Sequence, residues 1–232
     1  MRISAISFDG DMTLWDFYKV MRHSLTHTLR ELRQHVSTQR ALDLTVEDMI
    51  AIRNRLAEEV KGEVWNLEEI RRLAFEKTLE YVGYPDSDLA MHLNKIYLKH
   101  RFEDIELYKD VEPALDILAS YFKIGLLSNG NSYPERCGLA GRFDFVVLAQ
   151  DVRVAKPDRR IFQITAQKAC CPLARLLHVG DSLEQDVAGA GAAGAHTVWL
   201  NREGLTNDTG IKADYEISSL TDLSAILEVG RN

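Results

Sequence analysis

The apolar run at residues 3–8 ends in two carboxylates, and this pairing constrains the fold more than any other feature. Asp9 and Asp11 follow the run at positions i and i+2. If the run is a strand, both side chains leave the same face at its carboxyl end. Like charges held this close repel each other unless a cation or a shared proton offsets them. We therefore predict a chemical site at this end of the strand.

Further apolar runs in the second half of the chain are typical of buried strands. They occupy residues 123–127, 145–149, 175–179 and 197–200, with a weaker run near 214–217. Helical patterns separate them, at residues 111–121, 157–170, 183–193 and 221–228. Strands that alternate with helices form parallel crossover units whose sheet is covered on both faces. The predicted fold class is α/β, with a Rossmann-like parallel sheet.

The interval from residue 16 to residue 105 breaks this alternation. It contains no convincing strand, and its apolar residues follow helical spacing. Thr45 is placed to cap a helix, and residues 83–86 favour a turn. We predict about four inserted helices, which form a lid-like α-helical cap domain (16–105) over the carboxyl edge of an α/β core (1–15 and 106–232).

The composition excludes several classes of partner. The 232-residue chain carries a net charge of −7 and no run rich in lysine or arginine, which argues against nucleic acid and against an acidic membrane surface. No segment approaches the ~18 consecutive apolar residues of a membrane span. Asp9 and Asp11 interrupt the first apolar stretch too early for a signal peptide. The three cysteines lack zinc-ligand spacing, so we expect reduced thiols and a cytoplasmic protein. The expected oligomeric state is a monomer or a homodimer.

Donor groups follow two more of the predicted elements. Ser128 and Asn129 come directly after the strand at 123–127, where a hydroxyl and an amide suit a phosphoryl oxygen; ordinary turn chemistry is the alternative. Lys156 precedes Pro157, which we expect at the first helical position. The Lys156 ammonium could neutralise both a carboxylate and a phosphate oxygen, unless it is a solvated surface lysine.

A second acidic segment follows the strand at 175–179. Asp181 is expected at the same sheet edge as the first carboxylates and is a candidate ligand for a hard cation. Ser182 and Gln185 fit a capping box that opens the next helix. Asp186, one helical turn later, either supports the metal ligand, binds the metal itself, or complements the helix dipole.

These residues suggest phosphoryl chemistry. A carboxylate at position 9 can attack phosphorus to give an acyl phosphate, and the carboxyl of Asp11 can act as general acid and then as general base. Two unit charges about 4 Å apart repel by ~4 kcal/mol at an effective dielectric of ~20, and a phosphate dianion nearly doubles this. A divalent cation together with Lys156 can offset that repulsion.

The set of motifs resembles the haloacid dehalogenase-like (HAD) hydrolase superfamily over the whole chain. The resemblance rests on Asp-x-Asp-x-Thr at 9–13, Ser128-Asn129 after a strand, Lys156 before Pro-Asp, and Gly-Asp-x4-Asp at 180–186. The helical insert after the first motif resembles the type I (C1) cap, and the acidic residues resemble the phosphatase branch. Members often carry glycine where this chain has Met12, so the resemblance does not define the backbone conformation at that position.

The resemblance implies a role for each matching residue. Asp9 would be the nucleophile and a Mg²⁺ ligand, and Asp11 the general acid/base with its backbone carbonyl on the metal. Ser128 and Asn129 would hold the phosphoryl group, Lys156 would bridge Asp9 and phosphate, and Asp181 would complete the metal site, with Asp186 supporting it or joining it. Thr13 would shape the loop.

The function implied is a Mg²⁺-dependent phosphatase for a small phosphorylated metabolite. The alternatives are a 2-haloacid dehalogenase-type hydrolase, which attacks carbon and needs neither the metal nor the second aspartate, a phosphomutase, and a non-catalytic phospho-acceptor or binding protein. Candidate substrate contacts, each with a packing or solvated alternative, are Trp15, Tyr18, Arg22, His23 and Trp65. His178, inside a predicted strand, is interpreted as a hydrogen-bonded core histidine.

Overall fold

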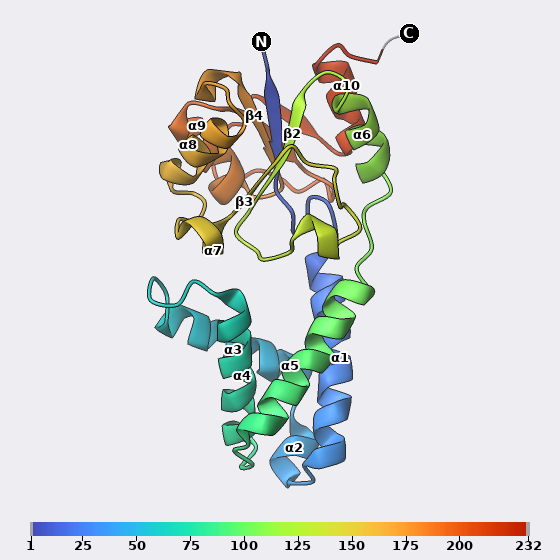
Figure 1. Ribbon diagram of the computed structural model, residues 1–232, viewed down its shortest axis with the longest axis vertical. Helices are drawn as coiled ribbons and strands as arrows, with labels where there is room; N and C mark the ends of the chain where they lie inside the picture. The colour runs from blue at the N-terminus through green and yellow to red at the C-terminus, as the bar shows by residue number, and fades with distance from the viewer. Residues whose placement is uncertain (1, 231–232) are drawn as a thin grey trace. The chain divides into compact units, whose positions relative to one another are not determined.

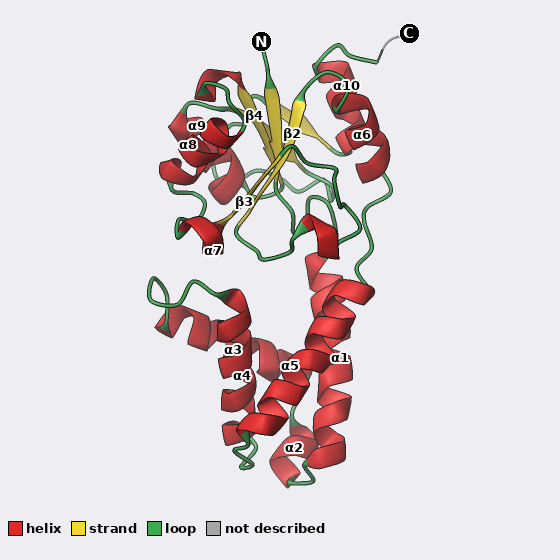
Figure 2. Cartoon of the chain, in the orientation of Figure 1, coloured by secondary structure: helices red, strands yellow, loops and turns green. Residues whose placement is uncertain are grey.

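The computed structural model describes residues 2–230, and the chain divides into two compact units. The core unit comprises Met1–Asp16 and Glu106–Asn232, and the helical unit comprises Phe17–Ile105. All strands lie in the core unit, while the helical unit contains helices and loops (Figure 2).

The core unit is built on a parallel sheet of six strands in the order β3-β2-β1-β4-β5-β6. The strands are β1 (Ala5–Phe8), β2 (Lys123–Ser128), β3 (Phe145–Leu148), β4 (Leu176–Gly180), β5 (His196–Leu200) and β6 (Tyr215–Ile217). β1 lies in the middle because its four residues are all buried and apolar or small. The predicted alternation of strands and helices, and the α/β class, are confirmed.

The register brings three strand ends close together, because β4 ends one residue and β2 two residues beyond the level at which β1 ends. Phe8, the last residue of β1, pairs with Leu126 of β2 on one side and with Val179 of β4 on the other. The polar residues that follow these strands therefore emerge at the same carboxyl edge of the sheet, where open parallel sheets bind their ligands.

Helices cover both faces of this sheet (Figure 1). The helices α8 (Arg159–Lys168) and α9 (Gly189–Ala193) lie on one side, and α6 (Val111–Leu118) and α10 (Leu223–Ile226) lie on the other. The buried face of α8 packs against strand residues such as Phe145 and Leu127. Gly125 makes room for the Phe145 ring, since a Cβ at that position would lie 1.9 Å from it.

Shorter elements complete the core unit. They are η1 (Pro134–Arg136), α7 (Ala149–Val152), η2 (Leu173–Arg175), the π-helical turn η3 (Leu183–Ala188) and η4 (Leu220–Asp222). The single helix predicted at 183–193 is thus wrong in its detail, because a π-helical turn precedes a short α-helix. The expected position of Pro157 is also wrong: α8 begins two residues later, where the Asp158 side chain accepts a hydrogen bond from the Arg160 amide. The Lys156–Pro157 peptide is cis.

The helical unit contains five helices rather than about four. They are α1 (Phe17–His35), α2 (Gln39–Asp43), α3 (Val46–Glu59), α4 (Leu67–Tyr81) and α5 (Ser87–Glu103). The additional helix, α2, has five residues and is capped by Thr38, and one turn is too short to show apolar periodicity. Thr45 caps α3 as predicted, in a capping box with Asp48. The unit has its own buried cluster, which includes Leu29, Leu32 and Leu93.

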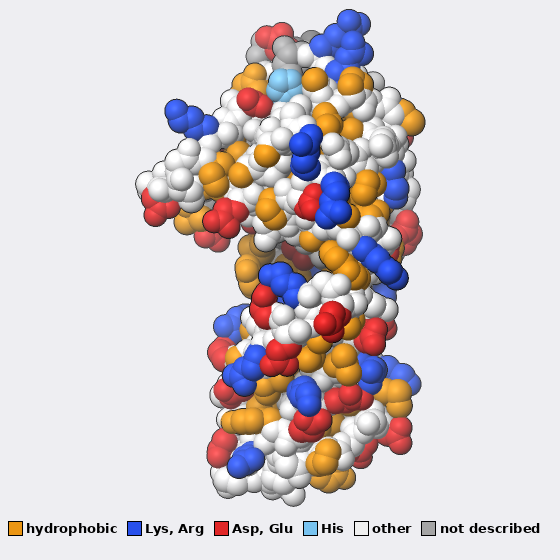
Figure 3. Space-filling model, turned by 90° about the vertical axis from the view of Figure 1, so that its left-hand side faces the viewer, with side chains coloured by type: hydrophobic (Ala, Val, Ile, Leu, Met, Phe, Trp, Pro, Cys, Tyr) orange, Lys and Arg blue, Asp and Glu red, His pale blue; other side chains and the backbone are white. Residues whose placement is uncertain are grey.

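Acidic and basic side chains are interspersed on the face drawn in Figure 3, rather than gathered by sign. This pattern agrees with the absence of a basic run in the sequence. Within residues 2–230, no helix has the length and apolar character needed to cross a membrane.

Candidate active site

The loop that follows β1 holds the first two carboxylates. The Asp9 amide donates to the Val179 carbonyl at 2.9 Å, which extends the sheet ladder one residue beyond the strand. The chain then turns tightly, because the Gly10 carbonyl accepts from the amides of Thr13 (3.2 Å) and Leu14 (2.8 Å). Met12 adopts a left-handed conformation with φ of 64°. Members of the family that the motifs resemble often carry glycine at this position. The backbone of Met12 adopts a conformation that residues with a side chain rarely adopt.

Trp15 positions Asp11. Its indole Nε1 donates to Asp11 Oδ1 at 2.7 Å, and the residue itself is fully buried. The ring lies against Gly10, where a Cβ would be 2.9 Å from it. The expectation that Trp15 contacts substrate is therefore wrong, because its ring is packed inside the core unit and its only polar atom is engaged by the carboxylate.

Lys156 lies between two buried carboxylates. Its Nζ donates to Asp9 Oδ1 at 2.5 Å and to Asp186 Oδ1 at 2.6 Å, and its side chain is 1% exposed. Burial opposes the charge, but the ion pairs with Asp186 and Asp9 outweigh it and raise the pKa of Lys156. The lysine is therefore a fixed ammonium in the site and not a solvated surface residue.

Asn129 fixes the backbone on which Lys156 stands. Its Nδ2 donates to the Lys156 carbonyl at 3.0 Å, and its Oδ1 accepts from the Lys156 amide at 2.8 Å. The same Nδ2 also donates to Gln185 Oε1 at 3.0 Å. Both ends of the amide are engaged within the protein, which favours a positioning role for Asn129 over direct contact with a phosphoryl group.

Ser128 lies beside Asp11 at the end of β2. Its hydroxyl is buried and accepts from the Gly130 amide at 3.0 Å, which leaves the hydroxyl hydrogen able to donate. A Cβ on Gly130 would lie 2.8 Å from Asp11 Oδ2 and 3.3 Å from Ser128 Oγ. A side chain at position 130 would therefore crowd the Asp11 carboxylate and the Ser128 hydroxyl.

Asp181 lies with Asp9 and Asp186 in a compact acidic group. One carboxylate oxygen from each of the three lies within 4.8 Å of the others. The Thr13 hydroxyl donates to Asp181 Oδ1 at 3.2 Å. Burial, followed by the charge of Asp186, raises the pKa of Asp181 to about 6, and burial also raises the pKa of Asp9 well above its ordinary value. Negative charge in this group therefore exceeds what Lys156 alone neutralises.

Asp186 is held by three donors. Its Oδ1 accepts from Lys156 and from His178 Nε2 (2.9 Å), and its Oδ2 accepts from the Ser182 amide (3.0 Å). Although burial opposes it, Lys156 and His178 lower the pKa of Asp186, so this carboxylate is ionised. The other ring nitrogen of His178 hydrogen-bonds Ser7 at 2.9 Å, which confirms the interpretation as a core histidine.

The predicted capping box after β4 is only half present. Ser182 Oγ accepts from the Gln185 amide at 3.1 Å as expected. The Gln185 side chain, however, accepts from Asn129 instead of returning to the Ser182 amide, which donates to Asp186. The prediction of a complete capping box is therefore wrong, because contacts from Gln185 to Asn129 and from the Ser182 amide to Asp186 replace its second half.

Four predicted substrate contacts lie in the helical unit. Tyr18 is 60% exposed, Arg22 pairs with Glu47 at 2.5 Å, and His23 hydrogen-bonds Asp104. Their role toward substrate, like that of Trp65, stays a prediction. Sequence reasoning named Asn129 and Trp15 as candidate contacts but missed their hydrogen bonds to Lys156 and Asp11. A weak signal existed for the tryptophan, since its spacing of four from Asp11 places the two within reach across a tight turn.

Comparison with known proteins gives a consistent family. The family model described as "haloacid dehalogenase-like hydrolase" matches residues 3–194. Among proteins similar in sequence are two from Escherichia coli K12. One is 5-amino-6-(5-phospho-D-ribitylamino)uracil phosphatase YigB, which is 27% identical over 97% of each chain. The other is pyrimidine 5′-nucleotidase YjjG, which is 29% identical over 98% of this chain and 99% of its own.

A similar solved structure is that of a 2-haloacid dehalogenase from Pseudomonas syringae pv. Tomato DC3000. It superposes with a TM-score of 0.81 at 32% identity, covering 97% of this chain and 98% of the other. The sequence and structure comparisons thus agree on the fold but differ in the named activity. The two sequence relatives are named as a phosphatase and a nucleotidase, and the solved structure is named as a dehalogenase.

Proposed function

Because the chain belongs to the haloacid dehalogenase-like hydrolases, we propose that it is a Mg²⁺-dependent phosphatase of a small phosphorylated metabolite. The observation that supports this most strongly is the pairing of two differently held carboxylates. Asp9 is fixed by the Lys156 ammonium at 2.5 Å, and Asp11 is fixed by the Trp15 indole at 2.7 Å. One is suited to nucleophilic attack, and the other to proton transfer.

The residues present fit a magnesium ion. Mg²⁺ prefers carboxylate oxygens, and the buried acidic group carries three carboxylates against one lysine ammonium. Asp9 and Asp181 have oxygens available to it, with the backbone carbonyl of Asp11 as the further ligand that the family implies. Asp186, whose oxygens already accept three hydrogen bonds, would support the site from behind. The bound ion would neutralise phosphoryl oxygens and lower the repulsion that an anionic substrate meets.

The hydrolysis then divides into two balanced steps on this chain's own residues. An oxygen of Asp9 attacks phosphorus and forms an aspartyl phosphate, while the bond from phosphorus to the leaving oxygen breaks and Asp11 protonates that oxygen. Water next attacks the aspartyl phosphate, Asp11 takes its proton, and inorganic phosphate leaves with Asp9 regenerated. Lys156 orients Asp9 throughout, and the Ser128 hydroxyl donates to a phosphoryl oxygen.

The dehalogenase activity named for the Pseudomonas syringae structure is the second candidate. Such an enzyme attacks carbon and requires neither a metal nor a second carboxylate. The positioned Asp11 and the raised pKa of Asp181, which a cation would relieve, favour the phosphatase.

The names of the two Escherichia coli relatives indicate which substrates to test first. Both enzymes are named for a phosphate ester on a five-carbon sugar or sugar alcohol joined to a pyrimidine. We therefore place pyrimidine 5′-nucleotides and related phosphorylated pentoses at the head of the substrate panel.

The test is phosphate release from this panel with Mg²⁺, with EDTA, and with Asp9→Asn. A matched control is Asp208→Asn, an exposed aspartate of the core unit outside the site. The proposal requires Mg²⁺-dependent release that Asp9→Asn abolishes and Asp208→Asn preserves. Halide release from a 2-haloacid without metal, and no phosphate release from any ester, would instead identify a dehalogenase. No turnover at all, despite Mg²⁺ binding, would identify a binding protein.

A further inference from the structure

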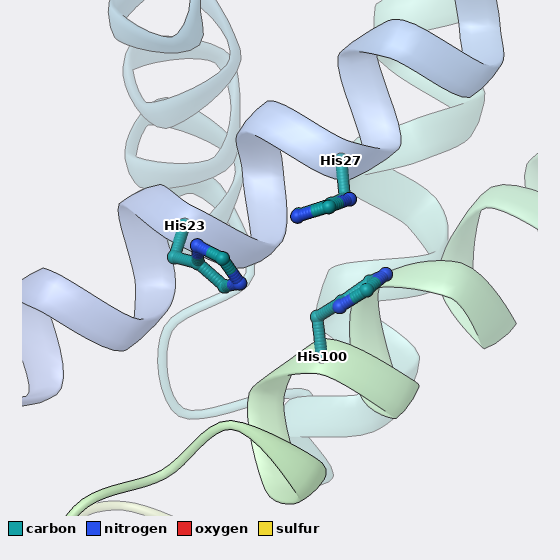
Figure 4. A group of neighbouring side chains, drawn as sticks. All are labelled: His23, His27 and His100. Carbon is teal, nitrogen blue, oxygen red and sulfur yellow. The ribbon is translucent and has the colours of Figure 1, made fainter.

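Three imidazoles meet on the helical unit, where α1 and α5 lie side by side. His23 and His27 come from successive turns of α1, and His100 comes from the last turn of α5 (Figure 4). Residues four apart on a helix share one face, so the two α1 rings point together toward α5. The rings of His27 and His100 are stacked, with centroids 3.8 Å apart and planes at 17°.

The ring nitrogens are close enough to share one ion. One nitrogen from each of the three histidines lies within 4.8 Å of the others. Zn²⁺–N bonds of ~2.0–2.1 Å place tetrahedral ligands about 3.3 Å apart, and each imidazole lone pair must point at the ion, so the His27 and His100 rings must rotate out of their stacked arrangement to bind one ion. His23 has a side chain that is 47% exposed and His100 one that is 21% exposed, which leaves such rotation possible.

A carboxylate already orients two of the rings. Asp104 Oδ2 lies 3.0 Å from His23 Nε2 and 2.7 Å from His100 Nδ1. Metal-binding histidines commonly have their second nitrogen fixed by such a carboxylate. Within residues 2–230, His27 takes part in ring contacts but in no hydrogen bond, so hydrogen bonding does not explain its place in this group.

A second polar group on α1 and α5 consists of Glu31, His35 and His92, and it differs from the three histidines because a carboxylate lies at its centre. There, Glu31 Oε1 already accepts hydrogen bonds from His35 (3.2 Å) and His92 (2.8 Å), and its carboxylate holds the two rings together. Hydrogen bonds therefore account for that group without an ion.

We propose that His23, His27 and His100 form a binding site for a divalent transition-metal ion of the Zn²⁺ class. Imidazole nitrogens suit such ions, whereas the all-oxygen acidic group of the core unit suits Mg²⁺. Three protein ligands leave a fourth position for water or another ligand. The ion would tie α1 to α5 and so stabilise the helical unit, independently of the hydrolytic function.

The experiment measures Zn²⁺ binding to the full chain without an affinity tag, by calorimetry in saturating Mg²⁺. The magnesium keeps the acidic group occupied. The variants are His27→Gln and His100→Gln, each checked for unchanged helicity and melting temperature in EDTA. Two controls are matched to them: His196→Gln, a histidine that faces a single carboxylate in the core unit, and the double variant Cys170→Ser/Cys171→Ser.

The proposal predicts one Zn²⁺ equivalent in the wild-type chain and in both controls. His27→Gln and His100→Gln should each weaken binding by at least about tenfold, and Asp104→Asn by roughly ten- to a hundredfold. Zinc should also raise the melting temperature of the wild-type helical unit and not that of His27→Gln. X-ray absorption should report three imidazole nitrogens around the ion. Absence of a bound equivalent, or binding that survives in both histidine variants, would overturn the proposal.

Discussion

Replacing Asp181 with asparagine should stabilise the metal-free protein at alkaline pH. Burial raises the pKa of this carboxyl from 3.8 to about 6 in the native state. The native state therefore binds more protons than the unfolded state between those values, and stability contributed by this group falls as pH rises through the window. A difference of about 2 units corresponds to about 3 kcal/mol, which is lost in full above pH ~6.

The Asp181→Asn variant removes the charge but retains an oxygen that can accept from Thr13. We expect its free energy of unfolding in EDTA to exceed that of the wild type by up to about 3 kcal/mol at pH 8 and to match it at pH 4. The assay is urea unfolding of the full chain, followed by tryptophan fluorescence, to which the buried Trp15 and Trp199 of the core unit contribute; the Trp199 indole donates to the Asp181 carbonyl at 2.9 Å. Both proteins share all other titrating groups, so their difference reports this carboxyl together with its effect on Asp9, whose pKa is raised by burial and further by the Asp181 charge.

Saturating Mg²⁺ should reverse the order, because the ion binds more tightly to the protein that retains the carboxylate and stabilises it more. The control Asp208→Asn should follow the wild type at each pH, with and without the ion. A variant that is less stable than the wild type at pH 8 in EDTA, or a stability difference independent of pH, would refute the assignment of excess negative charge to this group.

Three further substitutions test the site. Lys156→Met should destabilise the protein by about 3–5 kcal/mol in urea unfolding, because it leaves two buried carboxylates without their cation; an unchanged midpoint would contradict the ion pairs. Met12→Gly should relieve about 1–2 kcal/mol of left-handed strain but cost about 0.5–1 kcal/mol of glycine entropy, so stability should rise by up to about 1.5 kcal/mol. A loss of stability would mean that packing of the methionine side chain contributes more than the strain costs. Trp15→Phe keeps the ring packing but removes the hydrogen bond that orients Asp11. We expect kcat to fall by about ten- to a hundredfold, less than the ~10²–10⁴-fold that acid–base catalysis contributes in full; an unchanged kcat with a raised KM would indicate a role in binding.

The sequence was sufficient to predict the sheet and several of the polar residues that gather at its carboxyl edge. Buried parallel strands are continuous apolar runs, and the residues directly after them share one edge by register, which is why Asp9, Ser128 and Asp181 could be placed together. Lys156 comes from a loop outside the strands, and its contact with Asp9 followed from the family resemblance and from the need for a cation, not from periodicity.

The supporting contacts could not be predicted because they depend on tertiary structure. Asn129 reaches the Lys156 backbone across 27 residues, and its amide pattern has no sequence signature distinct from a turn. The cis peptide before Pro157 and the π-helical turn η3 were likewise not predicted from the sequence. The short α2 lacks the length that apolar periodicity requires.

The most direct test of the central claim is to trap the covalent intermediate during turnover. The enzyme, Mg²⁺ and its best phosphate ester would be mixed, quenched with acid within a turnover and digested for mass spectrometry. We predict a phosphoryl group on the Asp9 side chain of the N-terminal peptide, lost in Asp9→Asn and accumulating when Asp11→Asn slows its hydrolysis. Steady phosphate release with no adduct on Asp9, or with an adduct on another residue, would contradict the account.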